Sequence, residues 1–120
     1  MNRIELVATA APGTEVDLLE VNPDGTQQPF SITAGRPFVV TDISIQRETV
    51  LPGPTLLAVN ITQKPPNIHQ LRWAFVGSIS QNVERSFSTG MVFSTPFFVQ
   101  NAIEDSSAPA VIVRLWGFSE

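Results

Sequence analysis

Residues 87–99 alternate between two kinds of side chain, and this two-residue period constrains the fold more than any other feature of the sequence. The odd positions are mostly large and apolar: Phe87, Thr89, Met91, Phe93, Thr95, Phe97 and Val99. The even positions are mostly small or polar, and they include Gly90 and Pro96. Successive side chains of an extended chain point to opposite faces, so the pattern predicts β-strand. A helix would bury every third or fourth residue and would mix Phe with Ser and Gly. Thr89-Gly90 is a candidate turn or bulge between two strands.

The same period recurs in residues 39–47, 55–62, 69–79 and 110–118. The last of these runs is apolar on both faces, since Ile112, Trp116 and Phe118 oppose Val111, Val113 and Leu115. That composition is typical of a central strand covered on both faces, or of a strand whose second face meets a partner.

Short clusters of Pro, Gly, Asn and Asp separate the runs. The clearest cluster is residues 22–25, Asn-Pro-Asp-Gly. Pro presets φ at the second position of a type I turn, and Gly accepts the positive φ that follows. This cluster predicts a hairpin with a type I turn and a Gly bulge that pairs residues 15–21 with residues 26–32.

Eight or nine strands, with breaks about every dozen residues, predict an all-β fold. We expect residues 1–120 to form a single antiparallel β-sandwich that is jelly-roll-like. The predicted core residues are Val39, Ile43, Ile45, Leu57, Val59, Leu71, Trp73, Phe75, Phe87, Phe93, Phe97, Val111 and Val113.

Composition disfavours several classes of function. The formal charge is −4, and Lys64 and six arginines are the only basic residues, so no basic face is available for nucleic acid. Without Cys, thiol catalysis and Cys-ligated metal centres are excluded. The first residues do not form a signal peptide, and the uncharged stretch 86–103 is interrupted by polar residues, Gly and Pro. We therefore expect a soluble protein that spans no membrane, in a compartment that the sequence leaves open.

No arrangement of residues predicts catalysis. His69 is the only histidine, which excludes imidazole clusters for metal, and no GxSxG motif is present. Paired carboxylates for glycoside hydrolysis remain an alternative, because distance along the sequence does not give distance across a sheet. The candidate acids are Glu5, Asp42, Glu48 and Glu84, each more simply explained as an outward strand residue. We predict no catalytic residue, no metal ligand and no cofactor.

Arg114 and Trp116 project from one face of the last strand, and these residue types are enriched at binding hot spots. One interpretation is that they contact a ligand or a neighbouring subunit. The other is that a loop buries Trp116 while Arg114 pairs with an acid such as Glu84.

Val92 and Phe98 add apolar groups to the face opposite Phe97. If they face water they form an exposed apolar patch, which usually marks an interface. If a second sheet or a loop such as residues 62–68 covers them, they belong to the core.

Charged residues make up 15% of the chain, below the usual share of about 25%. We therefore expect a non-catalytic protein that acts through surface contacts as a homo-oligomer in an assembly. The alternative is a module that binds a carbohydrate or small ligand through Arg114 and Trp116, although the absence of Tyr argues mildly against a lectin.

Overall fold

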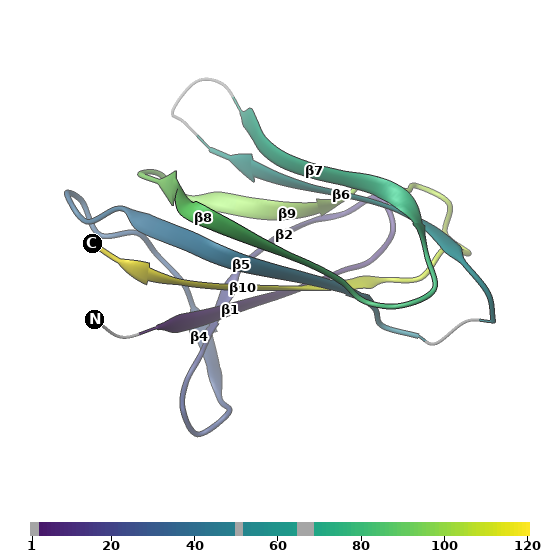
Figure 1. The fold of residues 1–120 in the computed structure, drawn as a ribbon, viewed down its shortest axis with the longest axis horizontal. Coiled ribbons are helices and arrows are strands. Elements are labelled where there is room, and N and C mark those ends of the chain that lie inside the picture. Colours follow the sequence, from purple (N-terminus) through teal and green to yellow (C-terminus); the bar gives the residue numbers. More distant parts are fainter. Residues whose placement is uncertain (1–2, 50–51, 65–68) are drawn as a thin grey trace.

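The computed structural model describes residues 3–49, 52–64 and 69–120, which form two antiparallel sheets and no helix. The sheets pack against each other as a β-sandwich, which confirms the predicted all-β fold (Figure 1). The larger sheet has the strand order β4-β3-β1-β10-β5-β8, and the smaller sheet has the order β2-β9-β6-β7. The strands are β1 (Ile4–Ala10), β2 (Glu15–Asp17), β3 (Leu19–Val21), β4 (Gln27–Pro29), β5 (Phe38–Arg47), β6 (Thr55–Gln63), β7 (Gln70–Ile79), β8 (Val83–Phe93), β9 (Phe97–Asn101) and β10 (Val111–Ser119). None of these residues forms a helix with the length and hydropathy that a membrane crossing requires.

The described part of the chain has ten strands because residues 15–21, expected to form one strand, are divided between the sheets. β2 pairs with β9 in the smaller sheet, whereas β3 pairs with β1 in the larger sheet. Leu18, between them, is buried in the core. The sandwich thus gains a corner at Leu18. The jelly-roll-like connectivity stays a prediction.

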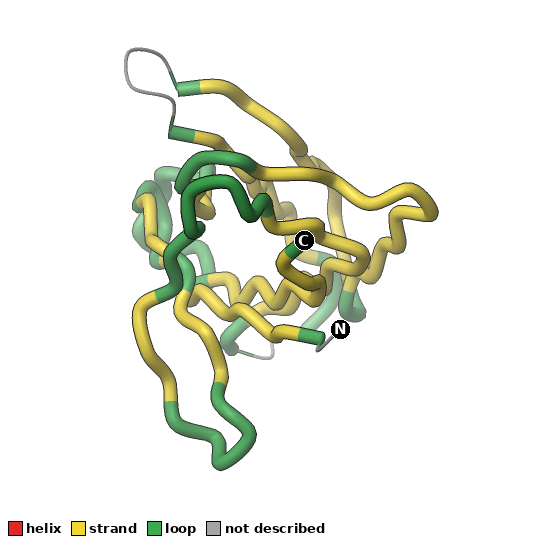
Figure 2. The backbone as a smooth tube through the Cα atoms, turned by 90° about the vertical axis from the view of Figure 1, so that its left-hand side faces the viewer, coloured by secondary structure: helices red, strands yellow, loops and turns green. Residues whose placement is uncertain are grey.

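The turn at residues 22–25 is confirmed, but the strands that it joins are shorter than predicted, since only residues 19–21 and 27–29 pair. The amide of Gly25 donates to the carbonyl of Asn22 (2.9 Å), and the amide of Asn22 donates to the carbonyl of Thr26 (2.8 Å). Gly25 has a φ of 90°, the left-handed conformation that a Gly bulge requires. β3 and β4 follow on either side, and the hairpin projects from the body of the sandwich (Figure 2).

The uncharged stretch 86–103 fills the core from both sheets. It supplies most of β8 to the larger sheet and all of β9 to the smaller one. Phe93 and Phe97 stack with ring centroids 4.1 Å apart, and Phe87 packs partly buried against the same core. The inward direction of all three phenylalanines confirms the two-residue period.

Most of the predicted core is buried where expected. Eight residues lie in the central cluster: Ile43, Ile45, Leu57, Val59, Phe93, Phe97, Val111 and Val113. Trp73, Phe75 and Phe87 are half-buried at its margin. The prediction was wrong for Leu71, which is 58% exposed.

Leu71 faces outward because a bulge shifts the alternation. Ile61 pairs with Trp73 but Thr62 pairs with Leu71, so Arg72 is an extra residue in β7. Its guanidinium donates to Gln63 and lies 4.8 Å from the ring centroid of Phe93.

A second bulge changes the position of Val39. Val40 pairs with Gly117 and Asp42 pairs with Trp116, so Thr41 has no partner on β10. Val39 is buried, but it lies outside the central cluster, whereas Val40 belongs to it. Val39 packs closely against two residues that lack a side chain, Gly90 and Gly117. An added Cβ would lie 2.3 Å from Val39 Cγ1 at Gly90 and 2.0 Å from the Val39 carbonyl oxygen at Gly117.

Candidate binding and assembly surfaces

Arg114 and Trp116 share one acceptor, the carboxylate of Glu5 on the neighbouring strand β1. Arg114 Nη1 donates to Glu5 Oε2 and Trp116 Nε1 donates to Glu5 Oε1, each at 3.2 Å. The ladder places Glu5 directly opposite Trp116, so all three side chains project from the outer face of the larger sheet. The ion partner of Arg114 is therefore Glu5 rather than Glu84. The side chains of Arg114 and Trp116, which the sequence predicted as a binding pair, are both half-buried.

Asp42 forms a second polar group beside Trp116. Its carboxylate accepts hydrogen bonds from Ser86 (2.7 Å), Thr41 (2.9 Å) and Arg3 (2.8 Å). The bond from Ser86, then that from Thr41 and then the charge of Arg3 lower the pKa of Asp42 below its ordinary value of 3.8. Asp42 is thus held as a carboxylate, with Arg3 fixed beside it.

A hollow of about 350 Å³ lies between these groups and the start of β8. Its lining residues are Arg3, Asp42, Ile43, Glu84, Arg85, Ser86 and Trp116. Arg3 lies over the indole of Trp116, with its guanidinium carbon 5.7 Å from the ring centroid. The sequence singled out Asp42 and Glu84 as acids but gave no signal for Arg3. These three side chains come together only through the register of β1, β10, β5 and β8, which the sequence does not show.

Phe98 and Val92 do not form a common exposed patch, and of the two alternatives the covered position holds for Phe98. Phe98, in β9, is only 1% exposed and lies beneath Lys64, whose Nζ is 4.9 Å from the ring centroid. The ring of His69 contacts Phe98 edge-on, with centroids 5.4 Å apart. Val92 belongs to the other sheet, opposite Val39, and is 41% exposed. The residues between Lys64 and His69, part of the loop considered as a cover, lie outside the described residues.

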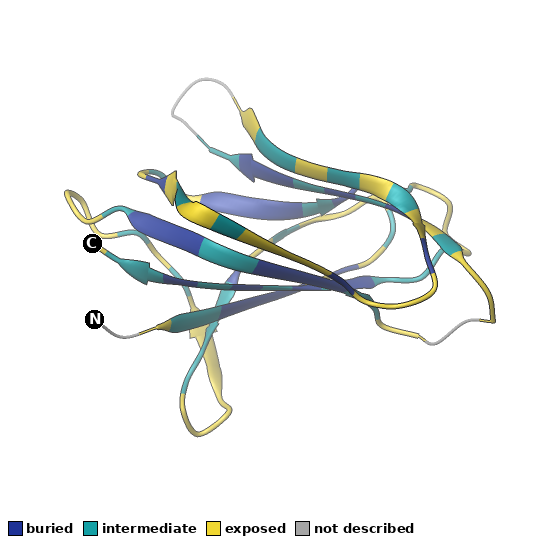
Figure 3. Cartoon of the chain, in the orientation of Figure 1, coloured by how far each residue is buried: buried dark blue, intermediate teal, exposed yellow. Residues whose placement is uncertain are grey.

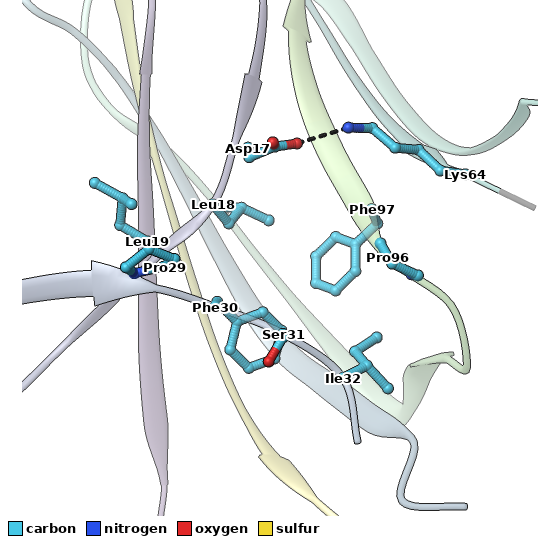
Figure 4. A pocket seen from close by; sticks show the side chains of 10 residues that line it. All are labelled: Asp17, Leu18, Leu19, Pro29, Phe30, Ser31, Ile32, Lys64, Pro96 and Phe97. Atoms are coloured by element: carbon cyan, nitrogen blue, oxygen red, sulfur yellow. Dashed lines mark hydrogen bonds and ion pairs between the residues drawn. The ribbon is translucent and has the colours of Figure 1, made fainter. Parts of the chain in front are cut away.

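A more apolar cavity of about 370 Å³ opens between residues 29–32 and the start of β9 (Figure 4). Phe30, Ile32 and Phe97 point into it, and the ring centroids of Phe30 and Phe97 are 6.1 Å apart. At its rim, Lys64 and Asp17 form an ion pair of 2.7 Å. The two charges compensate each other, so the cavity offers apolar walls and little to select a ligand.

The outer face of β6 and β7 carries few charges. β6, β7 and β9 together contain one charged residue, Arg72, and its side chain turns toward Phe93 in the core. Leu56, Leu71 and Val76 stand on this face, exposed by 53%, 58% and 71%. Val76 of β7 lies opposite Ala58 of β6, and Ala58 is two residues from Leu56 on the same face of β6. We call Leu56, Ala58, Leu71, Ala74 and Val76 the β6–β7 face.

The four strands at the sheet edges differ in how they are protected against further pairing. β2 and β4 are three residues long, and β4 ends in Pro29. β8 carries Glu84 and Arg85 and has a register shift next to Gly90, whose φ is 78°. β7 is ten residues long, contains no Pro and, in the described part of the chain, pairs only with β6. Figure 3 shows that it is exposed or half-buried over most of its length. Charges, prolines, bulges and short length are the usual protection of an edge. β7 has one charge and one bulge, both at Arg72 near its start, and residues 73–79 have neither.

Metal binding has no support in the described ranges, where no three acids or histidines approach one another closely enough to hold an ion. Comparison with known proteins gives no assignment either: no family model, no curated protein and no solved structure matches this chain.

Proposed function

We propose that this is a soluble, non-catalytic protein that assembles with copies of itself through β7. The observation that carries the proposal is the ten-residue edge strand β7, whose residues 73–79 have no charge, Pro or bulge, next to the uncharged β6–β7 face. An edge of this kind exposes a row of backbone amide and carbonyl groups that a second strand can pair with.

The occupant best suited to this edge is β7 of a second copy. Two identical edges related by a two-fold axis pair antiparallel, so that if residue i of one copy meets residue j of the other, residue j of the first copy meets residue i of the second. Antiparallel pairing also suits a strand that is already antiparallel to β6. The two smaller sheets would then form one continuous eight-stranded sheet across the dimer.

The β6–β7 face supports the same assembly. Edge pairing places the face of one copy beside that of the other, which doubles the length of the exposed apolar strip. Contiguous exposed apolar patches often mark interaction surfaces on soluble proteins. The low share of charged residues in the whole chain fits a protein whose surface is covered in this way.

Sedimentation velocity over a range of concentrations tests the proposal. The wild type should reach at least twice its chain mass of 13.1 kDa as the concentration rises. Val76→Lys should sediment as a monomer, because it places two ammonium groups at the paired edges, where like charges repel. Val76 is 71% exposed, so this change leaves the fold intact.

Val92→Lys is the matched control, since Val92 is also exposed and lies on β8 of the other sheet. This variant should assemble like the wild type. A wild type that stays monomeric at all concentrations would refute the proposal, and so would an oligomer that Val76→Lys leaves unchanged.

A further inference from the structure

We propose that the hollow beside Trp116 binds a neutral polyhydroxylated ligand, that is, a sugar ring free or within a glycan. The hollow lies on the larger sheet, whereas β7 belongs to the smaller sheet. The inference is therefore independent of the proposed assembly.

The charges of the hollow favour a neutral ligand. Arg3 and Arg85 supply two positive charges, and Asp42 and Glu84 supply two negative charges. Arg3 is also neutralised directly, since its Nη2 lies 2.8 Å from Asp42 Oδ2. An anion such as a phosphate would meet both carboxylates, and a cation would meet both guanidinium groups. A ligand with hydroxyl groups uses donors and acceptors equally and meets no repulsion.

Hydrogen-bonding capacity remains free in the hollow. The carboxylate of Glu84 is exposed and has neither a hydrogen bond nor an ion pair with the residues that the structure describes. Arg85 donates from Nη1 to the Glu84 backbone carbonyl, and its guanidinium carbon lies 5.8 Å from the ring centroid of Phe75, which leaves only its remaining N–H groups for a ligand. The hydroxyl of Ser86 donates to Asp42 and keeps its own acceptor capacity. Free acceptors and donors of this kind suit the hydroxyl groups of a sugar.

Trp116 supplies an apolar platform that is already oriented. The bond from its Nε1 to Glu5 fixes the plane of the indole. Arg3 lies over the ring with its side chain 62% exposed, so a sugar that packs against that face displaces the guanidinium. The ring is only half-buried. An aromatic side chain with an apolar face and a fixed polar edge can pack against the C–H face of a sugar while neighbouring groups bind its hydroxyls. Because the platform is ordered before binding, little entropy is lost there.

Two-dimensional NMR with ¹⁵N-labelled protein tests this site directly. The chain has two tryptophans, so the spectrum holds two indole N–H signals, and Trp116→Phe identifies the signal of Trp116. A panel of neutral monosaccharides and oligosaccharides is titrated against the protein. We expect at least one sugar to shift the Trp116 signal with a Kd of about 1 mM or tighter, the range for a small ligand held by few contacts. The signal of Trp73, in the other sheet, should not move.

Variants separate recognition from damage to the fold. Glu84→Gln keeps the shape of an exposed side chain, and we expect it to weaken binding about 5-fold, equivalent to the loss of one charge-assisted hydrogen bond. Glu15→Gln is the matched control, since it makes the same change on β2 of the other sheet, and it should bind like the wild type. Trp116→Phe lacks the indole reporter, so its fold and its binding are both followed through the backbone amide signals of the same spectrum, and it should bind more weakly than Glu84→Gln.

Several results would overturn the inference. One is a panel in which no neutral sugar shifts the Trp116 signal at 10-fold the expected Kd. Another is binding that Glu84→Gln and Trp116→Phe leave unchanged. A preference for sialylated or phosphorylated sugars over neutral ones would contradict the charge argument.

Discussion

Replacing Gly90 with Ala tests the packing of the β5–β8 bulge. Gly90 has a φ of 78°, and an Ala Cβ there would lie 2.3 Å from Val39 Cγ1. The left-handed conformation costs a non-Gly residue about 1–2 kcal/mol. Val39 is buried, and an added Cβ at Gly117 would come within 2.0 Å of its carbonyl oxygen, so Val39 has little room to move. Overpacking at such a site costs a further ~1–3 kcal/mol.

Gly90→Ala should therefore lower the free energy of unfolding by about 2–5 kcal/mol and Tm by roughly 8–20 °C. Gly25→Ala is the control, because Gly25 has a φ of 90° but no atom within 4 Å of the added Cβ. It should cost only the conformational part, about 1–2 kcal/mol.

Urea titration followed by circular dichroism measures both variants. Combining Gly90→Ala with Val39→Ala removes the contacting methyl groups, so the double-mutant cycle should show a favourable coupling of about 1–2 kcal/mol. Equal costs for Gly90→Ala and Gly25→Ala would refute the reasoning, because the contact with Val39 would then contribute nothing.

Three further predictions concern the core and the polar groups of the larger sheet. Phe97→Ala, at a ring stacked 4.1 Å from Phe93, should lower the unfolding free energy by about 3–5 kcal/mol in urea titration, and a cost below 1 kcal/mol would argue against this packing. The folded-state pKa of Asp42 lies below its ordinary value, so its contribution to stability is present above pH 3.8 and is lost as the pH falls through the folded pKa. Asp42→Asn should therefore unfold with a shallower dependence on pH below 3.8, and identical pH profiles for the two proteins would contradict the bond network. Glu5→Gln should change the free energy of unfolding by less than ~1 kcal/mol, since Arg114 and Glu5 are partly exposed. It should nevertheless shift the indole N–H signal of Trp116, and an unmoved signal would argue against the hydrogen bond from Trp116 to Glu5.

The two-residue period predicted much of this fold because it depends only on the geometry of extended backbone. It placed Phe93 and Phe97 in the core and Arg114 and Trp116 together on one outer face. The hairpin at residues 22–25 followed from turn chemistry, which is equally local. Periodicity failed at Leu71, because a bulge shifts the alternation by one residue and depends on the partner strand. Val39 is buried as predicted, but a second bulge leaves it outside the central cluster.

The candidate sites needed information that lies across the sheets. Glu5 is 109 residues from Arg114, so no local pattern favours it over Glu84 as a partner. Phe98 is buried because Lys64 and His69 cover its ring, and neither contact follows from the alternation of β9. The exposure of the β7 edge likewise depends on strand order, which the sequence does not specify.

Hydrogen exchange of the β7 amides, measured as a function of protein concentration, tests the proposed assembly most directly. If two copies pair through β7, amides within residues 70–79 should exchange more slowly as the concentration rises, while those of β8, residues 83–93, should not change. Exchange in β7 that is independent of concentration, or protection that develops at β8 instead, would contradict assembly through this edge.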